Sequence, residues 1–143
     1  MNVLFICTGN TCRSPMAEVI FNETYQKARA QSRGLFVHRG SVLSKEAREV
    51  LYREYGYQED RDAEELRDVD VMEADYIITM TEAQKREVRR RYGGERVFTL
   101  KELAGEHGDV IDPYGMNEGV YIETFSELRK LIQNIPEFEN FRR

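Results

Sequence analysis

The clearest chemistry in the sequence lies in the stretch "CTGNTCRS", residues 7–14, which follows the strand-like run "NVLFI". From Cys7 to Arg13 it spells C-x5-R. A cysteine thiolate is a strong nucleophile, and an arginine guanidinium can clamp two oxygens of a phosphoryl group. The spacing therefore predicts a nucleophile and an anion binder in one loop.

The position of this loop between a strand and a helix predicts a phosphate cradle. Such a loop directs successive backbone N–H groups into one concavity, and the helix dipole adds positive potential there. We expect Gly9 to allow a tight turn and Asn10 to hold the loop through side-chain hydrogen bonds. The positive potential of the helix N-terminus and of Arg13 also favours the thiolate form of Cys7, and Ser14 can donate a hydrogen bond to the Cys7 sulfur. The expected phosphoryl-binding residues are Thr8, Gly9, Asn10, Thr11, Cys12, Arg13 and Ser14.

A second stretch, "DVIDPYG", offers carboxyl groups that can supply a proton to a poor leaving group. Asp112 precedes Pro113, which restricts its backbone to an extended conformation and can direct its side chain into the site. We expect Asp112 to act as general acid in a first step and as general base for water in a second. Asp109 is the competing candidate, without the rigid proline context.

Each of these patterns also has a purely structural interpretation. C-x5-R occurs by chance, and Asp-Pro is often only a turn. Cys12 is expected to be a packed thiol, with a reversible disulfide to Cys7 as the alternative under oxidation. No metal site is expected, because the cysteine and histidine spacings fit no zinc pattern. The basic run "KREVRRR", residues 85–91, is expected to be a solvated helix face, with contact to an acidic partner as the alternative.

Bulk composition restricts the class of protein. The 143 residues suit one domain with a sizeable core, and 41% apolar and 33% charged residues are typical of a globular protein. A net charge of −5 argues against nucleic-acid binding, and no apolar run is long enough to span a membrane. Only two cysteines and no secretion signal at the N-terminus predict a cytoplasmic location. The sequence leaves the oligomeric state open.

The alternation of strand-like and helix-like segments predicts the fold. Short β-branched and aromatic runs predict strands at residues 2–6, 35–38, 75–80 and 96–100. A first helix should begin after "RSP", with Ser14 as N-cap and Pro15 in the first turn, and carry apolar residues to Ala28. The expected fold is a single α/β domain over residues 1–143: a three-layer sandwich with a twisted, parallel, four-stranded sheet and helices on both faces.

Three further helices are expected. One should run from Ser44 to Tyr55 and stop at Gly56. Another should start at Thr81, whose capping-box partner is Gln84, and end at the pair Gly93-Gly94. The last carries apolar residues on one face and should stop or bend near Pro136; these residues are Tyr121, Phe125, Leu128, Ile132 and Ile135. In such folds ligands bind beyond the carboxyl ends of the strands, where "CTGNTCRS" lies.

Together, "VLFICTGNTCRSPMAE" and "DVIDPYG" resemble the low-molecular-weight protein-tyrosine-phosphatase family, and "DYIITMT" and "VFTLKEL" follow in matching order. The resemblance implies Cys7 as nucleophile, Arg13 as phosphate and transition-state binder and Asp112 as proton donor. It implies a phosphocysteine intermediate, no metal or organic cofactor, and phosphorylated proteins as substrates.

Within that family the loop is most similar to the bacterial protein-arginine phosphatases. Relatives that act on phosphotyrosine usually carry Ile or Leu at the position of Thr11. The hydroxyl of Thr11 can instead form a hydrogen bond near a phosphoguanidinium nitrogen, or orient the attacking water. Tyr114 can form one wall of the site, and Gly115 stands where many tyrosine phosphatases place a second aromatic residue. "HRGSVLSKEA" and residues 57–70 depart from the family pattern, so substrate contacts from these segments do not carry over.

The expected function is therefore hydrolysis of phosphoarginine in proteins, with phosphotyrosine hydrolysis by the same residues as the alternative. An arsenate reductase also uses C-x5-R, but it normally needs further cysteines, and none follows Cys12. A non-enzymatic phosphate-binding module is a third interpretation. Such a module should have lost Cys7 or Asp112, and both are present.

Overall fold

The computed structural model describes residues 1–142 as a single domain built on one parallel sheet. The central strand, β1, pairs with β2 on one side and with β3 on the other. All strands point the same way, so their carboxyl ends share one edge of the sheet. In the order β2-β1-β3-β4 the strands are β2 (Arg29–Gly34), β1 (Asn2–Cys7), β3 (Tyr76–Thr79) and β4 (Val97–Thr99).

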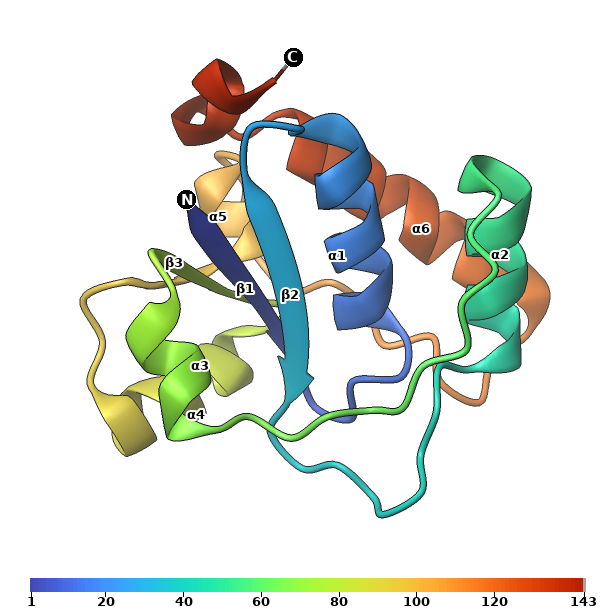
Figure 1. Ribbon diagram of the computed structural model, residues 1–143, viewed down its shortest axis with the longest axis horizontal. Coiled ribbons are helices and arrows are strands. Elements are labelled where there is room, and N and C mark those ends of the chain that lie inside the picture. Colours follow the sequence, from blue (N-terminus) through green and yellow to red (C-terminus); the bar gives the residue numbers. More distant parts are fainter. Residues whose placement is uncertain (143) are drawn as a thin grey trace.

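Helices cover both faces of this sheet, as Figure 1 shows. One face carries α1 (Arg13–Thr24), α2 (Lys45–Tyr55), the short α5 (Leu100–Leu103), α6 (Glu118–Gln133) and the 3-10 helix η1 (Pro136–Phe141). The other face carries α3 (Asp68–Glu73) and α4 (Glu82–Tyr92). The predicted three-layer α/β domain with a parallel four-stranded sheet is confirmed.

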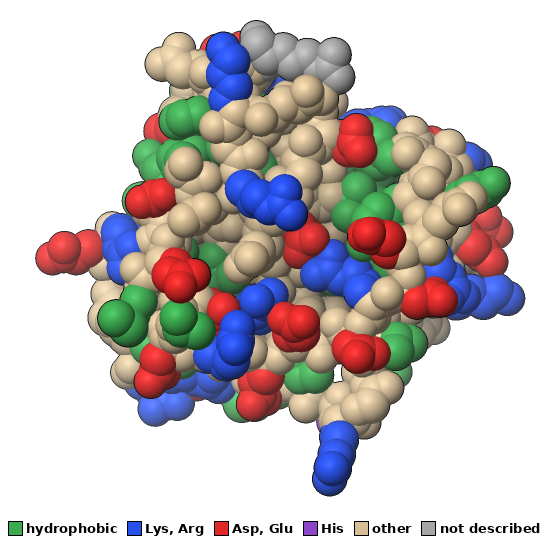
Figure 2. Space-filling model, viewed as in Figure 1, with side chains coloured by type: hydrophobic (Ala, Val, Ile, Leu, Met, Phe, Trp, Pro, Cys, Tyr) green, Lys and Arg blue, Asp and Glu red, His purple; other side chains and the backbone are tan. Residues whose placement is uncertain are grey.

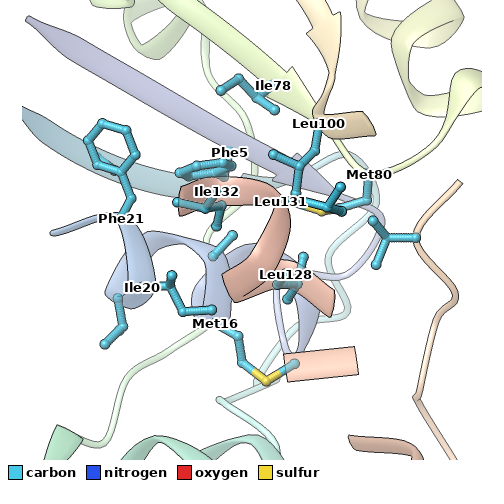
Figure 3. Packing of buried hydrophobic residues seen from close by; sticks show 14 of the residues in the cluster. Phe5, Met16, Ile20, Phe21, Ile78, Met80, Leu100, Leu128, Leu131 and Ile132 are labelled. Carbon is cyan, nitrogen blue, oxygen red and sulfur yellow. The ribbon is translucent and has the colours of Figure 1, made fainter. Parts of the chain in front are cut away.

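The central strand supplies residues to both cores. Val3, Phe5 and Cys7 belong to the core on the α1 and α6 side, whereas Leu4 and Ile6 pack against α3 and α4. Successive strand residues point to opposite faces, so a strand covered on both sides is apolar at nearly every position. Figure 3 shows the larger core, in which Phe5 and Ile78 from the sheet lie near side chains of α1 and α6.

The predicted helix boundaries at Ser44, Gly56 and Thr81 are confirmed. Ser44 accepts a hydrogen bond from the Ala47 N–H, and Gly56 ends α2 in a left-handed conformation with φ 70°. Thr81 and Gln84 form the expected capping box at the start of α4. Each signal depends on local hydrogen bonding, which sequence spacing alone can specify.

Three local predictions were wrong. The second strand is "RAQSRG", residues 29–34, and not residues 35–38. The strand predicted at 96–100 ends at Thr99, because Leu100 begins α5. The first helix ends at Thr24, before Ala28, and its N-cap is Cys12, with no side-chain capping bond.

The described surface carries charges of both signs. Figure 2 shows Lys and Arg side chains interspersed with Asp and Glu on the face seen there. Among residues 1–142, no helix is long and apolar enough to cross a membrane.

Candidate active site

The loop between β1 and α1 lies at the carboxyl edge of the sheet and is anchored by the chain that follows β2. The Leu35 N–H donates to the carbonyl of Cys7 (3.1 Å), and the Phe36 N–H donates to that of Thr8 (2.9 Å). Farther along, the Ser44 N–H donates to the carbonyl of Thr11 (3.0 Å). Three carbonyls of the loop thus have backbone partners in the chain that follows β2, and these bonds hold the loop in place.

Asn10 holds the turn of the loop. It is the one non-glycine residue with positive φ (57°) among residues 1–142, and it is 2% exposed. Its amide Nδ2 donates to the hydroxyls of Ser14 (2.9 Å) and Ser32 (3.0 Å), and its Oδ1 accepts from the Glu64 N–H (2.9 Å). The predicted side-chain role of Asn10 is therefore present in the structure.

The tight turn predicted at Gly9 is wrong, because the left-handed residue is Asn10. Gly9 is not among the positive-φ glycines, and a Cβ added there would meet only the Thr11 Oγ1, at an ordinary 3.8 Å. Asparagine tolerates the left-handed region better than most residues, and three side-chain hydrogen bonds fix it there.

Cys7 lies at the floor of this loop, and its sulfur is 2.9 Å from the Ser14 Oγ. The Asn10 N–H also donates to that sulfur (3.3 Å). Because the Asn10 amide already donates to the Ser14 oxygen, the hydroxyl hydrogen of Ser14 is free for the Cys7 sulfur. The N-cap role predicted for Ser14 is wrong for this reason: its hydroxyl serves the thiol.

Arg13 lies in the first turn of α1, is 4% exposed, and has polar partners in the segment that contains Val110 and Asp112. Its Nη1 donates to the Val110 carbonyl (2.9 Å), and its Nη2 lies 3.5 Å from the Asp112 Oδ2. The Asp112 side chain is 52% exposed, and its Oδ1 accepts from the Tyr114 N–H (3.1 Å). Two polar partners thus orient the carboxyl group over the loop.

The competing carboxylate, Asp109, does not join this group. Its Oδ1 accepts a hydrogen bond from the Glu82 N–H (2.9 Å), at the first turn of α4. A carboxylate at a helix N-terminus is a stabilising cap. The structure therefore brings Asp112, and not Asp109, to Cys7 and Arg13.

A pocket of about 430 Å³ opens over the loop. Three exposed apolar side chains, Phe36, Val42 and Tyr114, form its rim. Sequence reasoning missed Phe36, because residues 35–38 were predicted to form a strand, and it missed Val42, which lies in a segment that departs from the family pattern. The pocket is lined by Cys7, Thr8, Gly9, Thr11, Cys12, Arg13, Phe36, His38, Gly40, Ser41, Val42, Ser44, Asp112 and Tyr114.

Two further residues support the loop through contacts that no sequence motif predicts. Gly34 approaches the loop so closely that an added Cβ would lie 2.9 Å from the Thr8 carbonyl oxygen and 3.1 Å from the Asn10 Cβ. Gln84, whose Oε1 closes the capping box of α4, also donates through Nε2 to the Thr8 hydroxyl (3.1 Å). Both residues act from outside the pocket.

Residues 61–66 hold the loop from behind. The Gly34 N–H donates to the Glu64 carbonyl (2.8 Å), and the Leu66 N–H donates to the Gly34 carbonyl (2.9 Å). Arg61 makes two hydrogen bonds to the Glu18 carboxylate in α1, at 2.6 and 2.9 Å. This segment therefore contributes the Glu64 N–H that fixes Asn10.

Cys12 is a packed free thiol, as predicted, and Cys7 is free as well. The Cys12 sulfur lies 3.2 Å from the Tyr121 hydroxyl and 3.5 Å from the Ser44 Oγ. Burial, and secondarily the contact with Cys12, raises the pKa of Tyr121, so this phenol stays protonated at neutral pH. Across residues 1–142, no three His, Cys, Asp or Glu side chains are grouped so that they could hold a metal ion.

A doubly covered parallel sheet whose first strand leads through a C-x5-R loop into a helix defines the class of cysteine-based phosphatases. The chain belongs to the low molecular weight phosphotyrosine protein phosphatase family, whose model matches residues 2–139. The resemblance stated from the sequence is thereby confirmed.

Among curated relatives, the low molecular weight protein-tyrosine-phosphatase PtpB of Staphylococcus epidermidis is 38% identical over 136 residues, which cover 94% of this chain and 96% of the relative. A low molecular weight protein tyrosine phosphatase of T. tengcongensis has a similar solved structure: TM-score 0.87, 44% identity, with 96% of this chain and 98% of that chain covered. The YwlE arginine phosphatase of Geobacillus stearothermophilus also has a TM-score of 0.87, with 34% identity and 95% and 90% coverage.

Proposed function

We propose that this phosphatase hydrolyses phosphoarginine in proteins through a phosphocysteine intermediate on Cys7. The observation that carries the proposal is Thr11, a half-buried hydroxyl residue that lines the pocket beside Cys7. The structural likeness to the YwlE arginine phosphatase supports it.

In the proposed reaction, the substrate side chain meets the phosphate loop at Thr11, which lines the pocket. Its Oγ1 lies 3.6 Å from the Cys12 sulfur, and its carbonyl is tied to the Ser44 N–H. A hydroxyl here can hydrogen-bond to the polar guanidine nitrogens of phosphoarginine. A branched apolar residue would leave those nitrogens without a partner, and an unpaired buried polar group is costly.

In the first step the Cys7 thiolate attacks phosphorus, and an S–P bond forms as the P–N bond breaks. The electron pair of the broken bond stays on the guanidine nitrogen, which takes a proton from the Asp112 carboxyl group. Arg13 and the N–H groups of the loop bind the three equatorial oxygens, where the charge of the transition state accumulates.

In the second step water attacks the phosphocysteine. Asp112, now a carboxylate, takes a proton from the water, an O–P bond forms, and the S–P bond breaks. The electron pair returns to the Cys7 sulfur, where the hydrogen bonds from Ser14 and the Asn10 N–H stabilise the thiolate. Inorganic phosphate leaves, and Asp112 is protonated for the next cycle.

Phosphotyrosine hydrolysis is the second candidate function, because the family and the PtpB relative carry that name. The same trio can perform it, with the phenolic oxygen in place of the guanidine nitrogen. Phe36 and Tyr114 on the rim can pack against an aromatic ring as well as against an alkyl chain.

The substrates are inferred to be phosphorylated proteins of the cytoplasm. Three exposed apolar residues around the pocket offer contact area for the chain that flanks a phosphorylated side chain. The net charge of −5 at pH 7 favours protein substrates over nucleic acids, which are themselves negatively charged.

The test compares kcat/KM for a phosphoarginine peptide and a phosphotyrosine peptide of the same sequence, in the wild type and in Thr11→Ile. We expect the wild type to favour phosphoarginine by at least about tenfold, and Thr11→Ile to reverse the order, because the isoleucine replaces a polar partner by apolar bulk. Thr11→Ser, which keeps the hydroxyl, is the matched control and should retain the wild-type order. Faster turnover of phosphotyrosine by the wild type would refute the arginine assignment and leave a tyrosine phosphatase.

A further inference from the structure

Phe36 is an exposed aromatic side chain whose backbone belongs to the active site. Its N–H is bonded to the carbonyl of Thr8 in the phosphate loop (2.9 Å), and its side chain lines the pocket although the residue is 59% exposed. An exposed phenylalanine normally has several staggered χ1 rotamers available. Something must select one rotamer if the ring is to form a fixed wall.

Arg91, in the last turn of α4, is placed to do this. Its guanidinium carbon lies 5.0 Å from the centre of the Phe36 ring, within the range of a cation–π interaction. Its Nη2 donates to the carbonyl of Leu35, the neighbour of Phe36 (3.3 Å). One guanidinium therefore contacts both the ring and the backbone that carries it.

Glu87, one turn earlier on α4, fixes Arg91 in turn. Its carboxylate accepts from the Arg91 Nε at 2.6 Å, and it also accepts from Arg90. The two arginines differ in surroundings: the Arg91 side chain is 23% exposed and the Arg90 side chain 71%. The solvated helix face predicted for residues 85–91 is thus wrong for Arg91, which covers Phe36.

We propose that Arg91 is a positioning residue that holds the Phe36 ring as a wall of the pocket against the phosphorylated side chain of the substrate. The inference rests on the proposed function only in that the pocket takes a phosphorylated side chain, whether arginine or tyrosine. The hydrogen bonds and the ring contact of Arg91 within the described residues are with Leu35, Phe36 and Glu87, and none of these belongs to the phosphate loop.

This separation predicts which kinetic constants change. The phosphoryl group is bound by the loop and Arg13, which are held by Asn10, Gly34 and Gln84. Loss of Arg91 leaves those contacts intact, so inorganic phosphate should bind as before. The side chain behind the phosphoryl group loses a preformed wall, so the KM for a phosphopeptide should rise while kcat changes little.

The test measures kcat and KM for a phosphopeptide that the wild type hydrolyses, together with the competitive inhibition constant of inorganic phosphate. The variants are Arg91→Ala, Phe36→Ala and the double substitution, with Arg90→Ala as matched control because Arg90 shares Glu87 but does not touch Phe36. We expect KM to rise about two- to fivefold in Arg91→Ala and about tenfold in Phe36→Ala. The double variant should be no worse than Phe36→Ala, and Arg91→Lys should recover part of the loss.

Equal effects of Arg91→Ala and Arg90→Ala on KM would overturn the proposal, as would additive effects in the double variant. A rise in the phosphate inhibition constant that matches the rise in KM would also overturn it, since Arg91 would then act on the loop. Failure of the arginine assignment is seen separately, in the wild-type preference between the two peptides.

Discussion

The phosphate loop and the rim of the pocket are built in opposite ways. In the loop, Asn10, Arg13 and Ser14 are almost wholly buried, and each has hydrogen-bond partners within the protein. On the rim, Phe36 and Tyr114 are 59% and 70% exposed, and no hydrogen bond can fix an aromatic ring of phenylalanine. The two regions are adjacent, yet hydrogen bonds hold the side chains of the loop, whereas the aromatic rings of the rim are largely exposed.

The difference fits the proposed function, in which the loop binds the phosphoryl group and the rim contacts the rest of the substrate. The phosphoryl group is the same in every substrate, and its transition state is stabilised best by donors that need no reorganisation. The remainder of a protein substrate varies, and a rim of a few apolar side chains accepts variation at low cost. Rate should therefore depend on the loop, and selectivity on the rim.

The largest loss should come from the nucleophile. We expect Cys7→Ser to lower kcat by about 10⁴-fold or more, because the serine hydroxyl has no adjacent base to activate it. Cys12→Ser is the comparison, since its sulfur packs against Tyr121 and Ser44, and it should cost no more than about tenfold. Steady-state kinetics on an aryl phosphate measure both. Comparable losses in the two variants would contradict the assignment of Cys7.

A smaller loss is expected behind the loop. Asn10→Ala removes three side-chain hydrogen bonds and leaves an alanine at φ 57°, a conformation that costs about 1–3 kcal/mol for such a residue. We expect kcat/KM for an aryl phosphate to fall about 10- to 100-fold.

Asn22→Ala is the matched control for Asn10→Ala, because the Asn22 side chain also hydrogen-bonds to β2, at the backbone of Ala30, but lies away from the site. It should lower the melting temperature and leave kcat/KM close to the wild-type value. If both variants lose stability and activity in proportion, Asn10 has no specific role in the loop.

The smallest effect should come from the rim. Tyr114→Ala removes a wall of the pocket but keeps the backbone N–H that orients Asp112, so we expect the KM for a phosphopeptide to rise about three- to tenfold with little change in kcat. Ile111→Ala is its control, an exposed residue of the same segment outside the pocket lining. A fall in kcat larger than the rise in KM would assign Tyr114 to the placement of Asp112.

The site was more predictable than its supports. Cys7, Arg13 and Asp112 belong to contiguous motifs whose chemistry depends on residue type and spacing, and the structure brings the three together. Gly34, Gln84 and Glu64 reach the loop from distant segments, and no local pattern predicts these contacts, although the capping box marks Gln84 for its role in α4. Of the two roles expected for Ser14, the N-cap was wrong and the contact with the Cys7 sulfur is present, because the fold brings Asn10 and Cys7 to the same hydroxyl.

The error at β2 has a physical cause. β2 is an edge strand with the polar sequence "RAQSRG": Arg29 and Gln31 are exposed, and Ser32 and Arg33 are buried with polar partners, so hydrophobic periodicity assigns the segment to a loop. The more apolar "LFVH" that follows was taken for the strand, but its Leu35 and Phe36 bond back to the phosphate loop. Leu35 is buried in the core beneath α3 and α4, whereas Phe36 is exposed at the pocket, so the apolar character of this segment does not indicate a strand.

The bonds that hold Asn10 also bear on how the enzyme refolds. They join residues 22 and 54 positions away along the chain, at Ser32 and Glu64. Contacts of such separation form only after much chain entropy has been lost. Recovery of catalysis after dilution from denaturant should therefore coincide with completion of the native fold and lag behind the formation of helices.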